Sequence, residues 1–209
     1  MAKRLGIICI VLGVLCLLAA AGFVLYNRWE AQQAAQSSKA LLEDVQLAMA
    51  ENKISCPDGG DERLETKDDH APVPAQMATV DIDGDKCIGI LSVPALGLEL
   101  PVLTDWSYAK LKKAPCHYYG SCYEKNFVIA AHNFDAHFGR LSELQAGDIV
   151  MFTDVQGTGH SYEVVLLETL PPTATQTMIA SGFDLSLYTC TPGGGNRVTV
   201  RCSAKNISK

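Results

Sequence analysis

The sequence has no excess of basic residues, which removes one class of function at the outset. It contains 17 Lys and Arg against 23 Asp and Glu, a formal net charge of -6. Nucleic-acid-binding proteins usually present a basic face to the phosphate backbone, so this mildly acidic chain is not expected to bind nucleic acid. Charged residues make up only 19% of the chain, partly because one segment has none.

The uncharged segment, residues 5–26, reads LGIICIVLGVLCLLAAAGFVLY and is 22 residues long. As a helix that rises about 1.5 Å per residue, it would cross the roughly 30 Å apolar core of a bilayer. Lys3 and Arg4 precede it, and basic residues favour the cytoplasmic side. We therefore expect a single-pass protein of the cell membrane, with a cytoplasmic N-terminus and the rest of the chain outside.

A cleaved signal peptide is the alternative interpretation, because small residues occur at Leu18–Ala21. The apolar run continues to Tyr26, however, and is longer than the usual core of a signal peptide. We favour an uncleaved anchor, with residues 1–28 as cytoplasmic tip and transmembrane anchor.

Two connecting segments follow the anchor. Residues 29–55 are rich in Ala, Gln, Leu and Glu, which favour a juxtamembrane helix that only holds the next domain away from the bilayer. Residues 56–78 are acidic, contain Pro and Gly, and offer almost nothing to bury, so they are predicted to form a flexible linker.

Residues 79–209 form the expected folded domain, and their pattern is that of a β protein. The Asp83-Gly84 dipeptide predicts a hairpin turn, and Tyr108 to Lys113 a short helix. The main strands are expected at 87–93, 98–103, 127–131, 149–153, 161–170, 185–190 and 197–202. Seven or eight short strands with little helix indicate a closed barrel or a sandwich.

The stretch LYTCTPGGGNRVTVRC, residues 187–202, brings a thiol and a guanidinium to the two sides of one loop. Cys190 ends one predicted strand and Arg197 begins the next, with three glycines between them that allow a tight reversal. An antiparallel pairing would hold the two residues near each other. Whether they face the same way depends on register, which the sequence leaves open.

A cysteine needs a cationic neighbour to be a nucleophile at neutral pH, because its unperturbed pKa is near 8.5. Arg197 or a histidine could fill this role. His132 stands out among the five histidines, since it ends the apolar run Phe127–Ala131 and would be held rigidly at the rim of a sheet. His137 is the rival, whereas the other three lie in a linker, a short aromatic stretch and a turn: His70, His117 and His160.

These residues resemble the sortases, membrane-anchored cysteine transpeptidases of Gram-positive bacteria. Leu185–Cys190 is similar to the family's Thr-Leu-x-Thr-Cys strand, and the strand that begins at Arg197 is similar to the one that carries its essential arginine. Phe127–Asn133 looks like the strand that delivers its histidine, although Ala131 stands where many members have Gly. The similarity is nearer to the housekeeping type.

The resemblance implies a closed sortase-like β-barrel of seven to eight strands with short helices, preceded by a transmembrane helix. It implies catalytic roles for Cys190, His132 and Arg197, with Thr189 supporting the oxyanion site and Arg201 as the fallback for the arginine. No cofactor and no metal ligand set are expected, and calcium activation is left open.

The resemblance also implies a reaction and partners. The enzyme would cleave a Leu-Pro-x-Thr-Gly-like sorting signal at the C-terminus of surface proteins or pilins. It would then join the acyl group to an amine of the cell-wall precursor or of a pilin lysine, while its N-terminal helix contacts membrane lipid. Two alternatives remain: a thiol hydrolase with the same Cys and His, and a non-enzymatic wall-binding module.

Other interpretations are weaker. A zinc hydrolase built on His132 and His137 lacks the helical i, i+4 spacing of such sites. Leu100–Thr104 resembles a sorting signal but lies inside a predicted hairpin. Asp81, Asp83 and Asp85 favour a turn over a calcium loop. The remaining cysteines of the domain are expected to pack in the core, with a Cys116–Cys122 disulfide as an alternative: Cys87, Cys116, Cys122 and Cys202.

Overall fold

The structure is a computed structural model that describes residues 2–55 and 77–205, so the linker expected over residues 56–78 lies almost entirely outside the described residues. The helices, with two 3-10 turns, are α1 (Ala2–Ser55), η1 (Pro94–Leu96), α2 (Tyr108–Leu111), η2 (Leu141–Glu143) and α3 (Thr175–Ile179). The strands are β1 (Val80–Ile82), β2 (Asp85–Val93), β3 (Leu98–Leu103), β4 (Cys116–Tyr119), β5 (Phe127–Ala130), β6 (Ile149–Asp154), β7 (Gly159–Leu170), β8 (Leu185–Cys190) and β9 (Arg197–Ala204).

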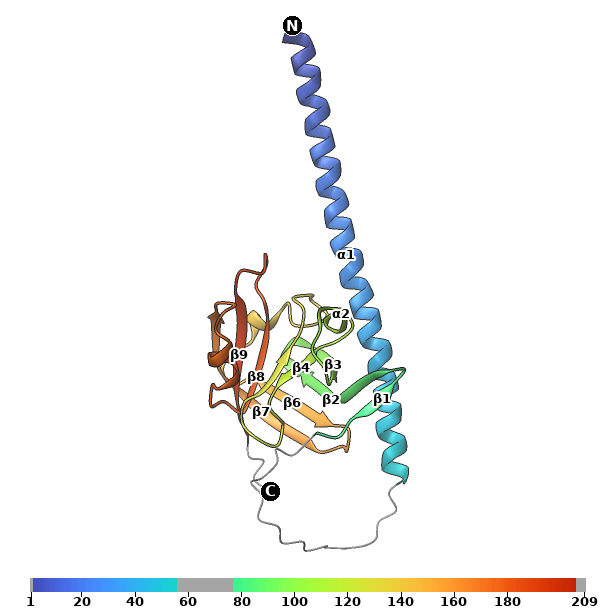
Figure 1. Cartoon of the computed structure of the whole chain (residues 1–209), viewed down its shortest axis with the longest axis vertical. Coiled ribbons are helices and arrows are strands. Elements are labelled where there is room, and N and C mark those ends of the chain that lie inside the picture. Colours follow the sequence, from blue (N-terminus) through green and yellow to red (C-terminus); the bar gives the residue numbers. More distant parts are fainter. Residues whose placement is uncertain (1, 56–76, 206–209) are drawn as a thin grey trace, which may run out of the picture.

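Strands β2 to β9 form a closed barrel, which confirms the predicted fold class (Figure 1). Around the barrel the order is β2-β3-β4-β5-β8-β9-β7-β6, and β6 pairs back onto β2. Strand β1 forms an antiparallel hairpin with the first residues of β2. Most neighbours are antiparallel, but β3–β4 and β5–β8 are parallel. Closure removes the unpaired sheet edges that would otherwise invite association.

Closure depends on one close approach between backbones. Strand β2 pairs with β3 and with β6, and at Gly89 it faces Val102 on one side and Asp154 on the other. A Cβ atom at Gly89 would lie 2.2 Å from the carbonyl oxygen of Thr153. Glycine is therefore required where β2 bends between its two partners.

Alternate residues of the strands fill the barrel. Leu185 and Leu187 of β8 point inward, together with Val200 and Cys202 of β9, and all four are buried in the main hydrophobic cluster. The residues between them point outward, as the two-residue period of a strand requires. The outer face of β8 and β9 is therefore available for the functional side chains.

The sequence predicted most of these strands within two residues. The Asp83-Gly84 turn is confirmed: both residues have positive φ angles, 50° and 86°, and they join β1 to β2. The amide of Gly84 donates to the side chain of Asp81, so this aspartate stabilises the turn. Strand β4 and helix α3 are too short to leave a clear periodic signal and were not predicted.

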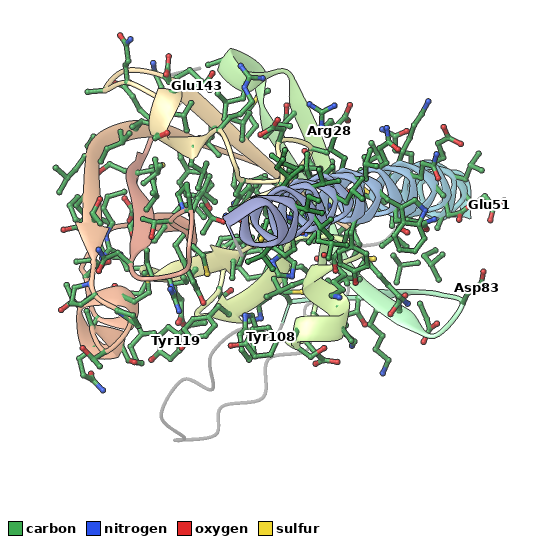
Figure 2. All side chains as sticks on the ribbon, turned by 90° about the horizontal axis from the view of Figure 1, so that it is seen from above. Arg28, Glu51, Asp83, Tyr108, Tyr119 and Glu143 are labelled. Atoms are coloured by element: carbon green, nitrogen blue, oxygen red, sulfur yellow. The ribbon has the colours of Figure 1, made fainter. Side chains whose placement is uncertain are left out.

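Helix α1 packs against the barrel along its second half, which corrects the expectation of a helix that only holds the domain away from the bilayer. Leu41 and Val45 of α1 are buried in a second hydrophobic cluster with residues of β2, β3 and β4. The β1–β2 hairpin lies on the same side of the molecule, with Asp83 at its tip near the end of α1 that carries Glu51 (Figure 2). This helix is therefore part of the folded unit.

The first half of α1 carries exposed apolar side chains. Ile10–Glu51 contains a stretch that is long and apolar enough to cross a membrane. A signal sequence near an N-terminus has the same properties. The helix could therefore be a membrane anchor.

Arg201 of β9 is expected from its sequence to be solvated or salt-bridged, and the structure shows it salt-bridged and fully buried. Its guanidinium lies 2.7 Å from Glu168 of β7 and donates to Ser186 of β8. It also donates to the backbone carbonyls of Thr177 and Met178, in α3. One side chain thus fixes α3 against three neighbouring strands, at the position where α3 borders the pocket described below.

We expect Arg201→Ala to lower the free energy of unfolding by roughly 3–5 kcal/mol, because it leaves Glu168 and two carbonyls without their partner. Urea unfolding of the full chain in detergent micelles measures this. Arg140→Ala is the matched control, since Arg140 pairs with Glu143 at the surface and should cost less than about 1 kcal/mol. Equal losses in the two variants would contradict the prediction.

Candidate active site

Cys190 and Arg197 lie directly opposite each other in the structure. Strands β8 and β9 are antiparallel, and their register pairs Cys190 with Arg197, Tyr188 with Thr199 and Ser186 with Arg201. Opposite residues of such a pair point to the same face of the sheet. The register that the sequence left open therefore directs the thiol and the guanidinium to one face.

His132 approaches Cys190 from the other neighbouring strand. Strand β5 runs parallel to β8, and their register pairs Ala130 with Tyr188. The pairing extends beyond β5, because the amide of Ala131 donates to the carbonyl of Tyr188 at 3.2 Å. Continued by one more residue, this register brings His132 beside Cys190. The strand that carries the cysteine thus lies between those that carry the other two residues.

The three side chains line one pocket of about 250 Å³. Its walls are largely apolar and aromatic, with Trp106 and Tyr108 from the β3–α2 segment and Tyr118 from β4. Helix α3 and the loop before it add Pro171, Pro172, Ala174, Thr175 and Met178, while Leu111, Ala130, Ala131 and Tyr188 complete the lining. The structure therefore brings Cys190, His132 and Arg197 together at one rim of the barrel.

The other cysteines of the domain are poor nucleophiles. Burial raises the pKa of Cys87, Cys116 and Cys202 to about 12, and that of Cys122 to about 11. All four are buried free thiols, so Cys116 and Cys122 form no disulfide. Cys190, by contrast, is only partly buried and opens into the pocket.

The other histidines of the described residues are not placed to serve Cys190. His137, the rival of His132, is completely buried, and burial lowers its pKa to about 4, so its ring is neutral at physiological pH. A ring nitrogen of His117 lies 2.8 Å from the carbonyl of Gly120. His160 lies outside the pocket that Cys190 lines.

Helix α1 contributes to the electrostatics of the site, which the sequence did not indicate. Burial lowers the pKa of His132, while the carboxylate of Glu30 raises it and the ammonium of Lys112 lowers it. Glu30 lies in α1, and its carboxylate pairs with Lys112 at 2.6 Å. The juxtamembrane part of α1 is thus close enough to the imidazole to bias its protonation.

The oxygen of the Thr189 side chain is already engaged. Thr189 is buried, and its hydroxyl donates to the carbonyl of Ala131 at 2.9 Å. This bond ties β8 to the residue before His132, so the side chain supports the histidine strand and faces away from the pocket. Arg197 donates from Nη1 to the carbonyls of Gly194 and Asn196, both at 3.1 Å, so its head lies over its own loop.

Sequence reasoning missed the aromatic walls of the pocket. Trp106 packs against Tyr108 and Tyr118, and Tyr118 packs edge-on against Tyr188, with ring centroids 5.2 to 6.1 Å apart. The sequence places only Tyr188 at this site, because alternation along β8 sets it on the same face as Cys190. The other three residues meet there only through the barrel topology.

The comparisons with known proteins agree with this geometry. The family model of the sortase domain matches residues 91–205, more than half of the chain. None of the curated proteins matches. Among solved structures, the Pilus Island 1 Sortase C2 of Group B Streptococcus is similar with 25% identity and a TM-score of 0.52, covering 57% of this chain and 74% of that chain.

Two further structures share the fold over a longer stretch. Sortase A from Corynebacterium diphtheriae, a lid mutant, has 20% identity and a TM-score of 0.53, covering 82% of this chain and 97% of that one. A Clostridium perfringens Sortase D5 transpeptidase has 18% identity and a TM-score of 0.55, covering 84% and 99%. These two likenesses include α1 in part and concern the fold alone.

We expect Glu30→Gln to lower the pKa of His132 further, by a small amount because the Glu30–Lys112 pair is partly exposed to solvent. Loss of the carboxylate removes the charge that favours the imidazolium. The matched variant Lys112→Gln removes the opposing charge and should raise the pKa. NMR titration of labelled histidine in both variants measures the shifts, and shifts of the same sign would contradict the assignment.

Proposed function

This chain belongs to the sortase family, and we propose that it is a cysteine transpeptidase that uses Cys190, His132 and Arg197. The observation that carries the proposal is the position of Cys190. Its strand lies between β5 and β9, which bring an imidazole and a guanidinium to the same pocket as the thiol. A nucleophile, a proton carrier and a hydrogen-bond donor to an oxyanion are what acyl transfer requires.

The proposed reaction has two halves. The Cys190 thiolate attacks the threonine carbonyl of a Leu-Pro-x-Thr-Gly-like sorting signal. The C–N bond then breaks, and His132, as imidazolium, gives its proton to the departing amine, which leaves a thioester on Cys190. An incoming amine attacks this thioester and gives a proton to His132, and the new amide leaves Cys190 free again.

Arg197 is proposed to bind the oxyanion or the substrate backbone. Its guanidinium is a planar set of five N–H donors, suited to two oxygens at once. In the structure Nη1 is bonded to the exposed β8–β9 loop, which holds three glycines. We infer that substrate replaces these loop carbonyls as the partners of the guanidinium.

The pocket walls suit an extended, partly apolar peptide. Trp106, Tyr118 and Tyr188 offer flat surfaces against which leucine and proline side chains can pack, and two prolines and Met178 face them. The proposed substrates are surface proteins or pilins that end in such a signal. The proposed acceptors are amines of the cell-wall precursor or of a pilin lysine.

The proposed cellular location rests on the apolar character of α1. We propose that its apolar first half anchors the protein in the cell membrane of a Gram-positive bacterium, with the N-terminus in the cytoplasm and the barrel outside. Lys3 and Arg4 at the start of the helix support this orientation. Both the substrate precursor and the amine acceptor would then be met at the outer surface of the membrane.

Cys190→Ala is expected to abolish cleavage of a fluorogenic sorting peptide while the domain stays folded. Turnover is followed by fluorescence, and folding by near-ultraviolet circular dichroism of the full chain in micelles. Cys202→Ala is the matched control, since that thiol is buried away from the pocket and its loss should leave the cleavage chemistry intact. Cleavage that survives in Cys190→Ala would refute the proposal.

An added amine separates transfer from hydrolysis. With the wild-type protein, mass spectrometry should find the peptide joined to the amine as the main product. Release of the free acid alone, even at saturating amine, would favour the thiol-hydrolase alternative.

Arg197→Gln is expected to reduce kcat at least about 100-fold, the typical loss when one donor to an oxyanion is removed. KM should change far less if the interaction forms mainly in the transition state. Arg197→Lys keeps the charge without the fork of donors and should recover only part of the rate. Arg140→Gln, at the surface, serves as the control. Full activity of Arg197→Gln would contradict this role.

A further inference from the structure

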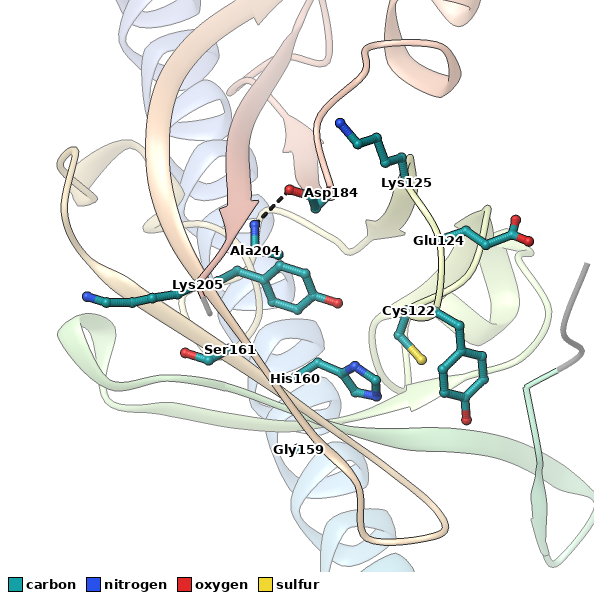
Figure 3. Close-up of a pocket in the computed structure, with 11 residues that line it drawn as sticks. Cys122, Glu124, Lys125, Gly159, His160, Ser161, Asp184, Ala204 and Lys205 are labelled. Carbon is teal, nitrogen blue, oxygen red and sulfur yellow. Dashed lines mark hydrogen bonds between the residues drawn. The ribbon is translucent and has the colours of Figure 1, made fainter. Parts of the chain in front are cut away.

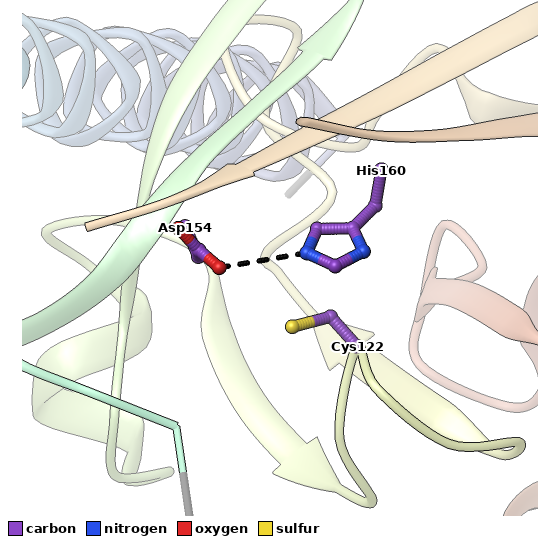
Figure 4. A group of neighbouring side chains, drawn as sticks. All are labelled: Cys122, Asp154 and His160. Atoms are coloured by element: carbon purple, nitrogen blue, oxygen red, sulfur yellow. Dashed lines mark ion pairs between the residues drawn. The ribbon is translucent and has the colours of Figure 1, made fainter. Parts of the chain in front are cut away.

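A second group of reactive side chains lies at the opposite end of the barrel from Cys190. The Sγ of Cys122, a carboxylate oxygen of Asp154 and a ring nitrogen of His160 all lie within 4.8 Å of one another (Figure 4). They come from the β4–β5 loop, the end of β6 and the start of β7. The chain brings three metal-binding residue types together here, and transpeptidation at Cys190 uses none of them.

The carboxylate of Asp154 is fixed in place by its neighbours. One oxygen accepts the backbone amides of Gln156 and Thr158 at 3.0 and 2.9 Å, which shapes the β6–β7 turn. The other oxygen accepts the hydroxyl of Tyr123 at 2.9 Å, from the β4–β5 loop. Hydrogen bonds of this kind orient the ligands of metal sites.

His160 holds a ring nitrogen whose hydrogen-bonding capacity is unmet. Its Nε2 is buried and has no hydrogen-bond partner in the described part of the chain, although it lies 3.5 Å from the Asp154 carboxylate. The ring packs against Tyr123 and Phe152, with centroids 5.6 and 6.2 Å away, so it is held toward the other two residues. A buried nitrogen without a partner is costly, and a bound cation would relieve that cost.

The cluster opens onto a pocket of about 440 Å³ (Figure 3). Cys122, Tyr123 and His160 line this pocket, together with Asp184, directly before β8, and Lys205, directly after β9. Solvent can therefore reach the cluster. Three protein ligands, with water in the fourth position of the tetrahedron, are a known zinc arrangement in open, solvent-accessible sites.

We propose that Cys122, Asp154 and His160 bind one zinc ion. A sulfur, an imidazole nitrogen and a carboxylate oxygen suit this borderline-soft cation better than calcium or magnesium, which prefer oxygen ligands alone. On binding, the thiol of Cys122 releases its proton to solvent and coordinates as the thiolate, while His160 coordinates in its neutral form. The ion ties the β4–β5 loop to the β6–β7 hairpin, and this role is independent of the proposed transpeptidase function.

Cobalt substitution tests the ligand set. The full chain carrying Cys190→Ala, in detergent micelles and freed of metal, is titrated with Co²⁺. We expect a thiolate-to-cobalt charge-transfer band and the visible bands of tetrahedral Co²⁺, which saturate at one equivalent and disappear on addition of Zn²⁺. The bands should be lost in Cys122→Ser and unchanged in Cys16→Ser, which removes an exposed thiol of α1. Absence of the bands, or their survival in Cys122→Ser, would overturn the proposal.

Thermal unfolding provides a second test that does not need a cysteine variant to fold. Zn²⁺ should raise the Tm of the wild-type protein in a saturable way, because it binds only the folded state. His160→Gln should abolish this rise, and Tyr123→Phe should weaken Zn²⁺ binding about tenfold by releasing the Asp154 carboxylate. A wild-type Tm that does not respond to Zn²⁺, or a full response in His160→Gln, would overturn the proposal.

Discussion

Backbone hydrogen bonds from β8 to two different neighbours determine where Cys190, His132 and Arg197 lie. On one side the parallel pairing with β5 leads to His132, and on the other the antiparallel pairing with β9 sets Arg197 opposite Cys190. A shift of one residue in either register would move a side chain to the opposite face. The interior side chains of β8 and β9 hold the register, because such a shift would expose Leu187 and Val200 to solvent.

Buried polar contacts stabilise both the pairing of these strands and one wall of the pocket. The hydroxyl of Thr189 joins β8 to Ala131, next to His132. Arg201, four residues after Arg197 on the same face, fixes α3 and so one wall of the pocket. The two arginines of β9 thus differ in burial: Arg197 is half-buried at the rim of the pocket, and the fully buried Arg201 holds the wall in place.

The sequence predicted the strands that carry the site residues better than it predicted how those strands pair. The period-two pattern and the glycine loop predicted β8 and β9 to within two residues, and the apolar run before His132 predicted β5. The parallel pairing of β5 with β8 could not be predicted from local pattern, since the paired residues lie far apart in the chain. The same holds for the packing of α1, whose apolar stripe was weak, and for Cys122, Asp154 and His160, which meet only through the closed barrel.

Because helix α1 is unbroken, it fixes the distance between its apolar first half and the pocket. Glu30, whose charge reaches His132, lies only four positions after Tyr26, where the apolar run ends. At a rise of about 1.5 Å per residue this is a height of roughly 6 Å. In Figure 1 the loop after β8 points toward the N-terminal end of α1, so the end of β8 that carries Cys190 lies on the side of the barrel nearer the apolar half of the helix. Under the proposed anchoring and substrate, a polypeptide still held in the membrane by its C-terminal tail would meet Cys190 near the lipid headgroups, after diffusion in two dimensions in place of diffusion through bulk solution.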